Sequence, residues 1–271
     1  QVFVFRCFGF SLDTTSFLSY SRSVIKLMRQ FKSANKGDAL SHLPQRPEVR
    51  TLERWAALCL LLMMFFQMNA SVMSKSPAFD EPAHVFRGCL TWRYAYKAGD
   101  PAHWVPGLLC LLAPELPTFD EPPDTLLKSR NAFFEHLDFS PDVLIFPARW
   151  VIIGLTLLLG AIVYRWGQSL TQGQGGLLAL GLLAFEPNLL AHGRLVTEDA
   201  FATFVFTLSL YLYWVLLHRP GPIPFFAAGA SLGVVLSGKP YAPVLLPVLG
   251  IMALTWGVCQ SGWKGMGRQL M

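Results

Sequence analysis

The sequence predicts an all-α membrane protein, a polytopic helix bundle with a long helical first outer loop. Of its 271 residues, 53% are hydrophobic and only 14% are charged, a balance that excludes an ordinary soluble globule. The hydrophobic residues also gather into runs long enough to cross a hydrocarbon core of ~30 Å. We therefore expect the chain to cross a membrane several times.

Six apolar runs are the expected crossings. They are 55–73, 147–164, 175–190, 200–217, 223–236 and 241–258. Residues 1–54 carry many basic side chains without a sustained apolar period, so we interpret them as a basic cytoplasmic arm and 55–271 as the membrane domain. Because the chain starts at Gln1 rather than at a methionine, we expect it to be a fragment.

The charges orient this bundle. With the basic arm inside, the loops after the second, fourth and sixth runs also fall inside, and each carries an Arg or a Lys, as the positive-inside rule expects. The outer loops are then 74–146, 186–199 and 237–240, and they hold nearly all acidic residues of the membrane half. The net charge of +5 thus follows from topology and does not indicate a nucleic-acid partner.

Two adjacent carboxylates follow the first run, in the segment Phe79-Asp80-Glu81-Pro82-Ala83-His84. At a membrane exit, charged side chains reach both water and headgroups at little desolvation cost compared with the bilayer centre. Pro82 is expected to hold the chain out of helix just after the pair. The alternative is that the acids only cap the next helix, since acids stabilise helix N-termini.

The outer loop 186–199 is dense in ionisable groups, among them His192, Arg194, Glu198 and Asp199. Ionisable groups at this depth are costly, which favours a functional site. The alternative is a solvated loop in which Thr197 or Asp199 caps the fourth crossing.

Three cations are expected on the same outer side. Arg149 opens the second crossing, Arg194 lies in the loop, and Lys239 lies between the fifth and sixth crossings. Together they could cradle a phosphate, because Arg offers a planar fork and Lys a point charge. For Arg149 and Lys239, snorkelling to lipid headgroups is the alternative.

The first outer loop contains two amphipathic stretches, 84–97 and 106–117, which suit helices lying in the membrane interface or helices packed on the protein. The second Phe-Asp-Glu-Pro, at 119–122, is interpreted as a loop feature. A disulfide between Cys89 and Cys110 is possible, because both lie in this loop. The cysteines show no metal-ligand spacing.

The order of these features resembles the phospholipid carrier-dependent glycosyltransferases. These C-type (GT-C) membrane enzymes are related to protein O-mannosyltransferases and to the aminoarabinose transferases that modify lipid A. The resemblance covers about residues 56–250. Its most specific parts are the segment 79–84 and the pattern Glu-Pro-Asn-x-x-Ala-His-Gly-x-x-x-Thr-x-Asp within 186–199. Gly99-Asp100, Ala148-Arg149 and Lys239 add to it.

This resemblance implies transfer of a mannose-like or aminoarabinose-like sugar from a polyprenyl-phosphate carrier to a hydroxyl of a protein or glycolipid. It implies three catalytic residues: Asp80 as the base or acceptor-binding group, Glu81 as a group that positions the acceptor or tunes Asp80, and Asp199 as the acidic residue that closes the loop before the fourth crossing. The groups expected to bind substrate or phosphate are His84, Arg149, His192, Arg194 and Lys239. No cofactor is required, and a divalent metal is possible but not indicated.

The implied location is a bacterial plasma membrane, with the active face periplasmic or extracellular. The sequence departs from the family in carrying His103-Trp104-Val105-Pro106 where His-Pro-Pro-Leu is usual, and Glu198 where Thr is frequent. The C-terminal spans of the family are absent, so this half could be inactive alone. A transporter or flippase is the alternative function, but transporters place polar groups near the midplane, whereas here they lie outside the crossings.

Overall fold

The structure is a computed structural model that describes residues 47–93, 101–112, 133–171 and 175–261, together with residues 116 and 131. The chain divides into two compact units, Gln1–Leu52 and Glu53–Met271. Of the first unit only residues 47–52 are described, so most of the predicted arm lies outside the described residues. The second Phe-Asp-Glu-Pro, at 119–122, lies outside them as well.

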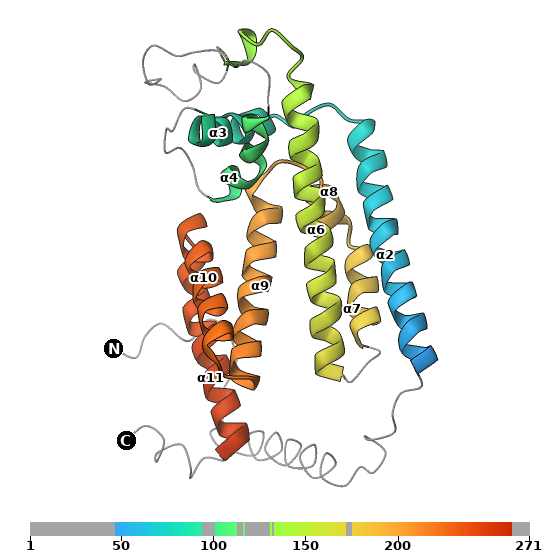
Figure 1. The fold of residues 1–271 in the computed structure, drawn as a ribbon, viewed down its shortest axis with the longest axis vertical. Coiled ribbons are helices and arrows are strands. Elements are labelled where there is room, and N and C mark those ends of the chain that lie inside the picture. Colours follow the sequence, from blue (N-terminus) through green and yellow to red (C-terminus); the bar gives the residue numbers. More distant parts are fainter. Residues whose placement is uncertain are drawn as a thin grey trace, which may run out of the picture. The chain divides into compact units, whose positions relative to one another are not determined.

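Every regular element of the described residues is helical, which confirms the predicted all-α class. The apolar helices are α2 (Pro47–Met73), α6 (Asp142–Thr171), α7 (Gly175–Ala184), α9 (Glu198–His218), α10 (Pro222–Gly238) and α11 (Leu245–Ser261). The other elements are α3 (Glu81–Arg93), α4 (Pro101–Gly107), η1 (Leu108–Leu111), α8 (Pro187–His192) and η2 (Ala242–Val244). In Figure 1, α3 and α4 lie at the end of the bundle where α2 ends and α6 and α9 begin.

Four helical segments are long and apolar enough to cross a membrane, namely Thr51–Met73, Asp142–Thr171, Glu198–His218 and Ala242–Gln260. They coincide with the first, second, fourth and sixth predicted crossings. The third and fifth contain shorter apolar helices, α7 and α10, so the total of six crossings stays a prediction. Because a helix satisfies its own backbone hydrogen bonds, it is the form that such apolar segments need in lipid. The protein is therefore an integral membrane protein.

Helix α6 is the most enclosed of these four segments. Half of the residues in its most apolar stretch are buried, against 17–28% in the other three segments. Helix α6 packs against α7, α9, α3 and α4. Large apolar side chains such as Phe66, Leu178 and Phe226 are instead 64–71% exposed on the outside of the helices. A lipid-facing surface explains this exposure, since lipid tails are as apolar as these side chains.

Helices α3 and α4 cross in direct backbone contact at two glycines. A Cβ atom added at Gly88 would lie 2.5 Å from the carbonyl oxygen of His103 and 2.6 Å from Cα of Gly107. Any larger residue at Gly88 would therefore separate the two helices. This backbone contact determines where along α3 the neighbouring His103 lies.

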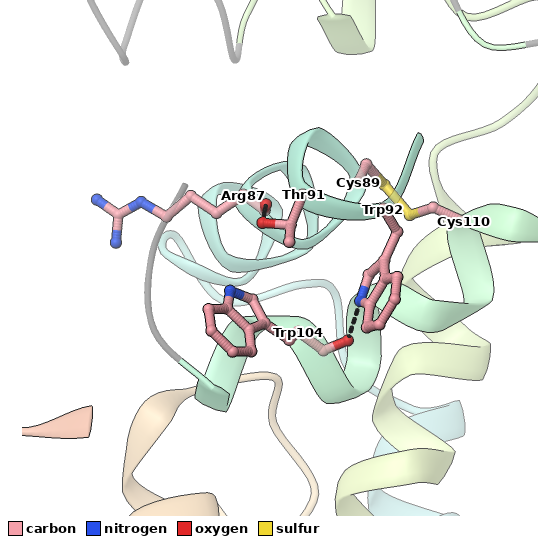
Figure 2. Close-up of a disulfide and its surroundings, with 6 residues drawn as sticks. All are labelled: Arg87, Cys89, Thr91, Trp92, Trp104 and Cys110. Carbon is pink, nitrogen blue, oxygen red and sulfur yellow. Dashed lines mark hydrogen bonds between the residues drawn. A yellow bond between two sulfur atoms is a disulfide. The ribbon is translucent and has the colours of Figure 1, made fainter. Parts of the chain in front are cut away.

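A disulfide and a hydrogen bond also hold this pair of helices together. Cys89 of α3 is bonded to Cys110 of η1, as the sequence allowed, and the Trp92 indole donates to the carbonyl of Trp104 at 2.7 Å (Figure 2). The inner face of α3 is buried against α6 and Phe133. The first amphipathic stretch of the outer loop is thus a helix packed on the protein.

Two local predictions were wrong. Helix α3 begins at Glu81 with Pro82 in its first turn, because a proline without an amide hydrogen is tolerated where that hydrogen would have no intrahelical partner. Helix α6 begins at Asp142, so Arg149 lies two turns inside it rather than at its start.

Candidate active site

Glu81 and Arg149 form a fully buried ion pair. Both side chains are 0% exposed, and the guanidinium donates from Nε to Oε1 at 2.9 Å and from Nη2 to Oε2 at 2.6 Å. This two-pronged geometry is the strong form of an Arg–carboxylate contact. A charge this deep is tolerated only when it is paired and hydrogen-bonded.

The pair ties four segments together. Glu81 also accepts from the backbone amides of Ala78, at 2.7 Å, and Val196, at 2.9 Å. Arg149 donates to the carbonyls of Lys75 and Ser76, both at 3.2 Å, just after α2. The end of α2, the start of α3, helix α6 and the loop before α9 thus share one polar centre, which we call the Glu81–Arg149 clamp.

The hydrogen bonds to Glu81 outweigh the effect of its burial. Burial alone would raise the pKa of this carboxyl, but the hydrogen bond from Arg149 and those from the amides of Val196 and Ala78 lower it below its ordinary 4.5. Glu81 is therefore a carboxylate whose oxygens are already engaged by four donors. The structure thus places Glu81 and Arg149 in a buried contact between these segments, and their predicted roles toward the acceptor and the phosphate stay predictions.

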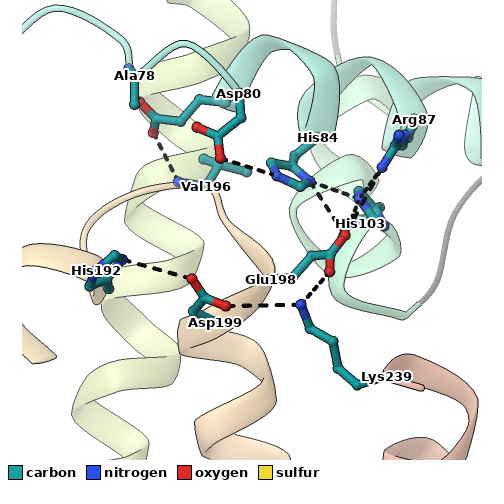
Figure 3. Close-up of polar contacts among 11 residues, drawn as sticks. Ala78, Asp80, His84, Arg87, His103, His192, Val196, Glu198, Asp199 and Lys239 are labelled. Atoms are coloured by element: carbon teal, nitrogen blue, oxygen red, sulfur yellow. Dashed lines mark hydrogen bonds and ion pairs between the residues drawn. The ribbon is translucent and has the colours of Figure 1, made fainter. Parts of the chain in front are cut away.

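Asp80 points the other way. Its carboxylate is 58% exposed and lies 3.8 Å from Nε2 of His84, one turn along α3. In Figure 3 it faces the rim formed by α3, α4 and the start of α9, together with His84 and Glu198. The two adjacent acids therefore have separate environments, one dry and one open to solvent.

A compact cluster continues from His84. Its Nδ1 lies 2.8 Å from Nε2 of His103, which lies 3.3 Å from Oε1 of Glu198, and His84 Nδ1 is 4.0 Å from the same oxygen (Figure 3). Arg87 also faces it, with Nη1 3.4 Å from His103 and 4.0 Å from Glu198. We call His84, His103 and Glu198 the histidine–glutamate cluster.

Lys239 links the cluster to Asp199. Its ammonium donates to Oε2 of Glu198 and lies 3.9 Å from Asp199, whose other oxygen lies 3.9 Å from Nδ1 of His192. Burial alone would lower the pKa of Lys239, but Glu198, Tyr241 and Asp199 raise it above its ordinary 10.5, so the lysine is a permanent cation. Burial and His103 lower the pKa of His84 below 6.5 despite Glu198 and Asp80, which favours the neutral imidazole.

Arg194 is buried with an unused donor. It is only 8% exposed, and its Nη1 finds no hydrogen-bond partner among the residues that the structure describes. The neighbouring Thr197 stands at the N-cap position of α9, but its side chain makes no cap hydrogen bond. The capping alternative is thus met in the position of Thr197 but not in a side-chain hydrogen bond. Nη1 of Arg194 retains its donor capacity for a further group.

A shallow, open groove begins at Asp199 and follows one face of α9. It is lined by Asp199, Ala202, Thr203, Phe206, Thr207 and Tyr241. The residues of α9 in this list recur every three or four positions, so they form one stripe of the helix. The groove is thus charged at its head and mostly apolar along its length.

Of the predicted site residues, the structure brings most to one rim. Asp80, His84, Asp199, His192 and Lys239 form a chain of contacts no longer than 4.0 Å per step, joined by Glu198. Glu81 and Arg149 lie in the clamp instead. The contacts of His103, Glu198 and Arg87 were not predicted from the sequence, although Glu198 and the residues just after His103 depart from the family pattern.

Comparison with known proteins supports the relationship to C-type glycosyltransferases. Residues 141–266 match the family described as dolichyl-phosphate-mannose-protein mannosyltransferase. No curated protein and no solved structure matches the chain significantly. The matched range holds Arg194, Glu198, Asp199 and Lys239, whereas Asp80 and His84 precede it. The match covers less than half of the chain and supports a relationship to membrane glycosyltransferases of this kind over that range.

Proposed function

We propose that this chain is the part of a membrane glycosyltransferase that binds a polyprenyl-phosphate sugar and moves the sugar to a hydroxyl acceptor. The observation that carries the proposal is the single charged rim at one end of an apolar bundle, beside the groove on α9. A lipid-linked sugar has the same polarity pattern, with a phosphate and sugar on an apolar chain. The charged rim thus matches the phosphate and sugar of such a substrate, and the apolar helices match its hydrocarbon chain.

Asp80 is the general base in this proposal. It takes the proton of the acceptor hydroxyl as the hydroxyl oxygen attacks the anomeric carbon, and the bond from that carbon to the carrier phosphate breaks with its electron pair on the phosphate oxygen. A positioned base typically contributes ~10²–10⁴-fold to such a step. The exposure of Asp80 supports this role, because an acceptor on a protein or glycolipid must reach the base from solvent.

Lys239 and Arg194 bind the departing phosphate. Fixed cations stabilise negative charge where it develops, and they need no reorganisation during the reaction. Lys239 lies beside Asp199 at the head of the groove, and Arg194 has a buried donor without a partner among the described residues; both are therefore placed to meet an anion. Asp199 and His192 orient Lys239 and the sugar at the head of the groove.

The polyprenyl chain occupies the groove on α9. Ala202 and Phe206 give it an apolar floor below Asp199, and Tyr241 forms one wall. The phosphate then lies at the level of Lys239, and the chain runs toward the membrane interior.

We place this rim on the extracytoplasmic side. The Cys89–Cys110 disulfide supports this face, since disulfides persist in oxidising compartments and are rare in the cytosol. The positive-inside pattern of the loops supports the same orientation.

Sugar transfer in membranes holding the full-length protein tests the function. With radiolabelled polyprenyl-phosphate mannose as donor, Asp80→Asn should lose transfer by at least ~10²-fold, the low end of a general base's contribution. Asp142→Asn is the matched control, because Asp142 is an exposed aspartate in the first turn of α6 and should transfer at the wild-type rate. Full turnover by Asp80→Asn would remove Asp80 from the mechanism, and carrier movement across vesicles without transfer would favour a flippase.

A further inference from the structure

Three helices contribute one possible metal ligand each to the histidine–glutamate cluster. His84 comes from α3, His103 from α4 and Glu198 from the first turn of α9, and their ligand atoms all lie within 4.8 Å of one another. Two imidazoles and one carboxylate are a frequent ligand set of zinc sites that keep a fourth position open.

The spacing of the three atoms fits one small cation. Tetrahedral zinc with bonds of ~2.0–2.1 Å places its ligand atoms ~3.3–3.4 Å apart. The observed separations are 2.8 Å for His84 Nδ1 to His103 Nε2, 3.3 Å for His103 Nε2 to Glu198 Oε1, and 4.0 Å for His84 Nδ1 to Glu198 Oε1. They bracket the tetrahedral value, so small side-chain rotations bring all three atoms to bonding distance.

We propose that His84, His103 and Glu198 bind a divalent cation of the zinc class, with a fourth position open to the rim. This site does not depend on the proposed sugar transfer, because binding of the ion is measured without any substrate.

The surroundings of the cluster match an outer shell that orients metal ligands. Ligating histidines usually direct their second nitrogen to a carboxylate, and ligating carboxylates are hydrogen-bonded in turn. Here Nε2 of His84 faces Asp80 at 3.8 Å, and Lys239 donates to the second oxygen of Glu198. The contact with Asp80 uses Nε2 of His84 and leaves its Nδ1 facing the cluster. The contact with Lys239 uses Oε2 of Glu198 and leaves its Oε1 facing the cluster.

The competing explanation is an ordinary ion-pair network. Arg87 lies close to the same acceptor atoms of His103 and Glu198, so the guanidinium and a metal ion exclude each other. The Arg87 side chain is 34% exposed and can turn to solvent when an ion binds. A metal site therefore predicts tighter ion binding in Arg87→Gln, because the competing positive charge is removed.

Zinc titration of the tag-free chain in detergent micelles, after dialysis against a chelator, tests the site. We expect one zinc ion per chain by calorimetry and mass spectrometry of metal content. His84→Ala, His103→Ala and Glu198→Gln should each weaken binding by at least ~10–100-fold, the loss typical of removing even an outer-shell partner. His192→Ala is the matched control, since His192 lies on the same rim without joining the cluster, and it should bind as the wild type does.

Glu198→Gln keeps the volume of the side chain and serves where a histidine variant does not fold. Cobalt(II) in place of zinc gives a second readout, because its visible absorption reports tetrahedral coordination and should vanish in the same variants. The proposal fails if the stripped wild-type chain shows no saturable zinc binding. It also fails if binding survives in all three ligand variants, which would show an adventitious ion only, or if His192→Ala weakens binding as much as they do.

Discussion

Replacing Glu81 with alanine should destabilise the folded protein far more than any change at the neighbouring Asp80. The substitution leaves Arg149 as an unpaired charge in a fully buried position, and breaking one side of such a pair costs ~3–5 kcal/mol. The amides of Ala78 and Val196 lose their acceptor as well, at about 1–3 kcal/mol for each one that stays dry. Against a total stability of ~5–15 kcal/mol, this loss decides whether the bundle holds together.

The structure also predicts how much of this loss a second change restores. Arg149→Met in the Glu81→Leu background removes both charges, and apolar replacements of buried pairs are often neutral or stabilising. The double variant should therefore be more stable than either single variant. Its coupling energy should lie at or above the ~0.5–3 kcal/mol typical of residues in contact.

The assay is unfolding in mixed micelles by titration with a denaturing detergent, followed by helix content. Asp80→Asn serves as the control, because an exposed side chain outside the clamp should change stability by no more than ~0.5 kcal/mol. Equal stability of Glu81→Ala and Asp80→Asn, or additive effects of the Glu81 and Arg149 substitutions, would refute the conclusion that Glu81 stabilises the fold and Asp80 does not.

Three further predictions concern the same end of the bundle. The pKa of Glu81 lies below its ordinary 4.5 in the folded protein. Its contribution to the free energy of unfolding is therefore complete above about pH 4.5 and is lost as the pH falls through the lowered pKa. The difference in stability between wild type and Glu81→Gln should accordingly disappear only in stronger acid. Gly88→Ala should cost ~1–3 kcal/mol by overpacking and weaken sugar transfer, whereas Gly154→Ala, where a new Cβ meets nothing within 4 Å, should do neither. Cys89→Ser should lower stability by ~2–5 kcal/mol, and Cys110→Ser should do the same without adding to it. Reducing agent should then affect the wild type alone.

The helix bundle could be predicted from the sequence because each apolar helix is specified by residues that are adjacent in the chain. A run of apolar residues is sufficient to predict a helix in lipid, and the charges between the runs oriented it. The number of crossings between them also predicted that Asp80, Asp199 and Lys239 lie at the same end of the bundle. These predictions needed no knowledge of which side chains touch.

The roles of the two adjacent acids were not predictable in this way. Successive side chains of a helix point about 100° apart, so the start of α3 at Glu81 turns one acid inward and leaves the other at the rim. The partner of Glu81 is 68 residues away in sequence, and Arg149 was expected at the start of its helix. A contact of that separation depends on how α3 and α6 pack.

His103 was missed for a similar reason. Its place beside His84 depends on the backbone contact between Gly88 and Gly107 and on the disulfide that joins α3 to η1. Neither glycine has a distinctive sequence signal in a long, aromatic-rich loop. The sequence departs from the usual family pattern just after His103 and at Glu198, but nothing in it indicated that the two positions lie together.

Photo-crosslinking of a polyprenyl-phosphate analogue, with the reactive group next to the phosphate, tests the account most directly. In membranes holding the full-length protein, peptide mapping should find the adducts at the start of α9 and around Lys239 and Tyr241. Arg194→Gln together with Lys239→Gln should abolish them. Adducts at the opposite end of α9, near Trp214 and His218, would place the carrier head on the other face and contradict the account.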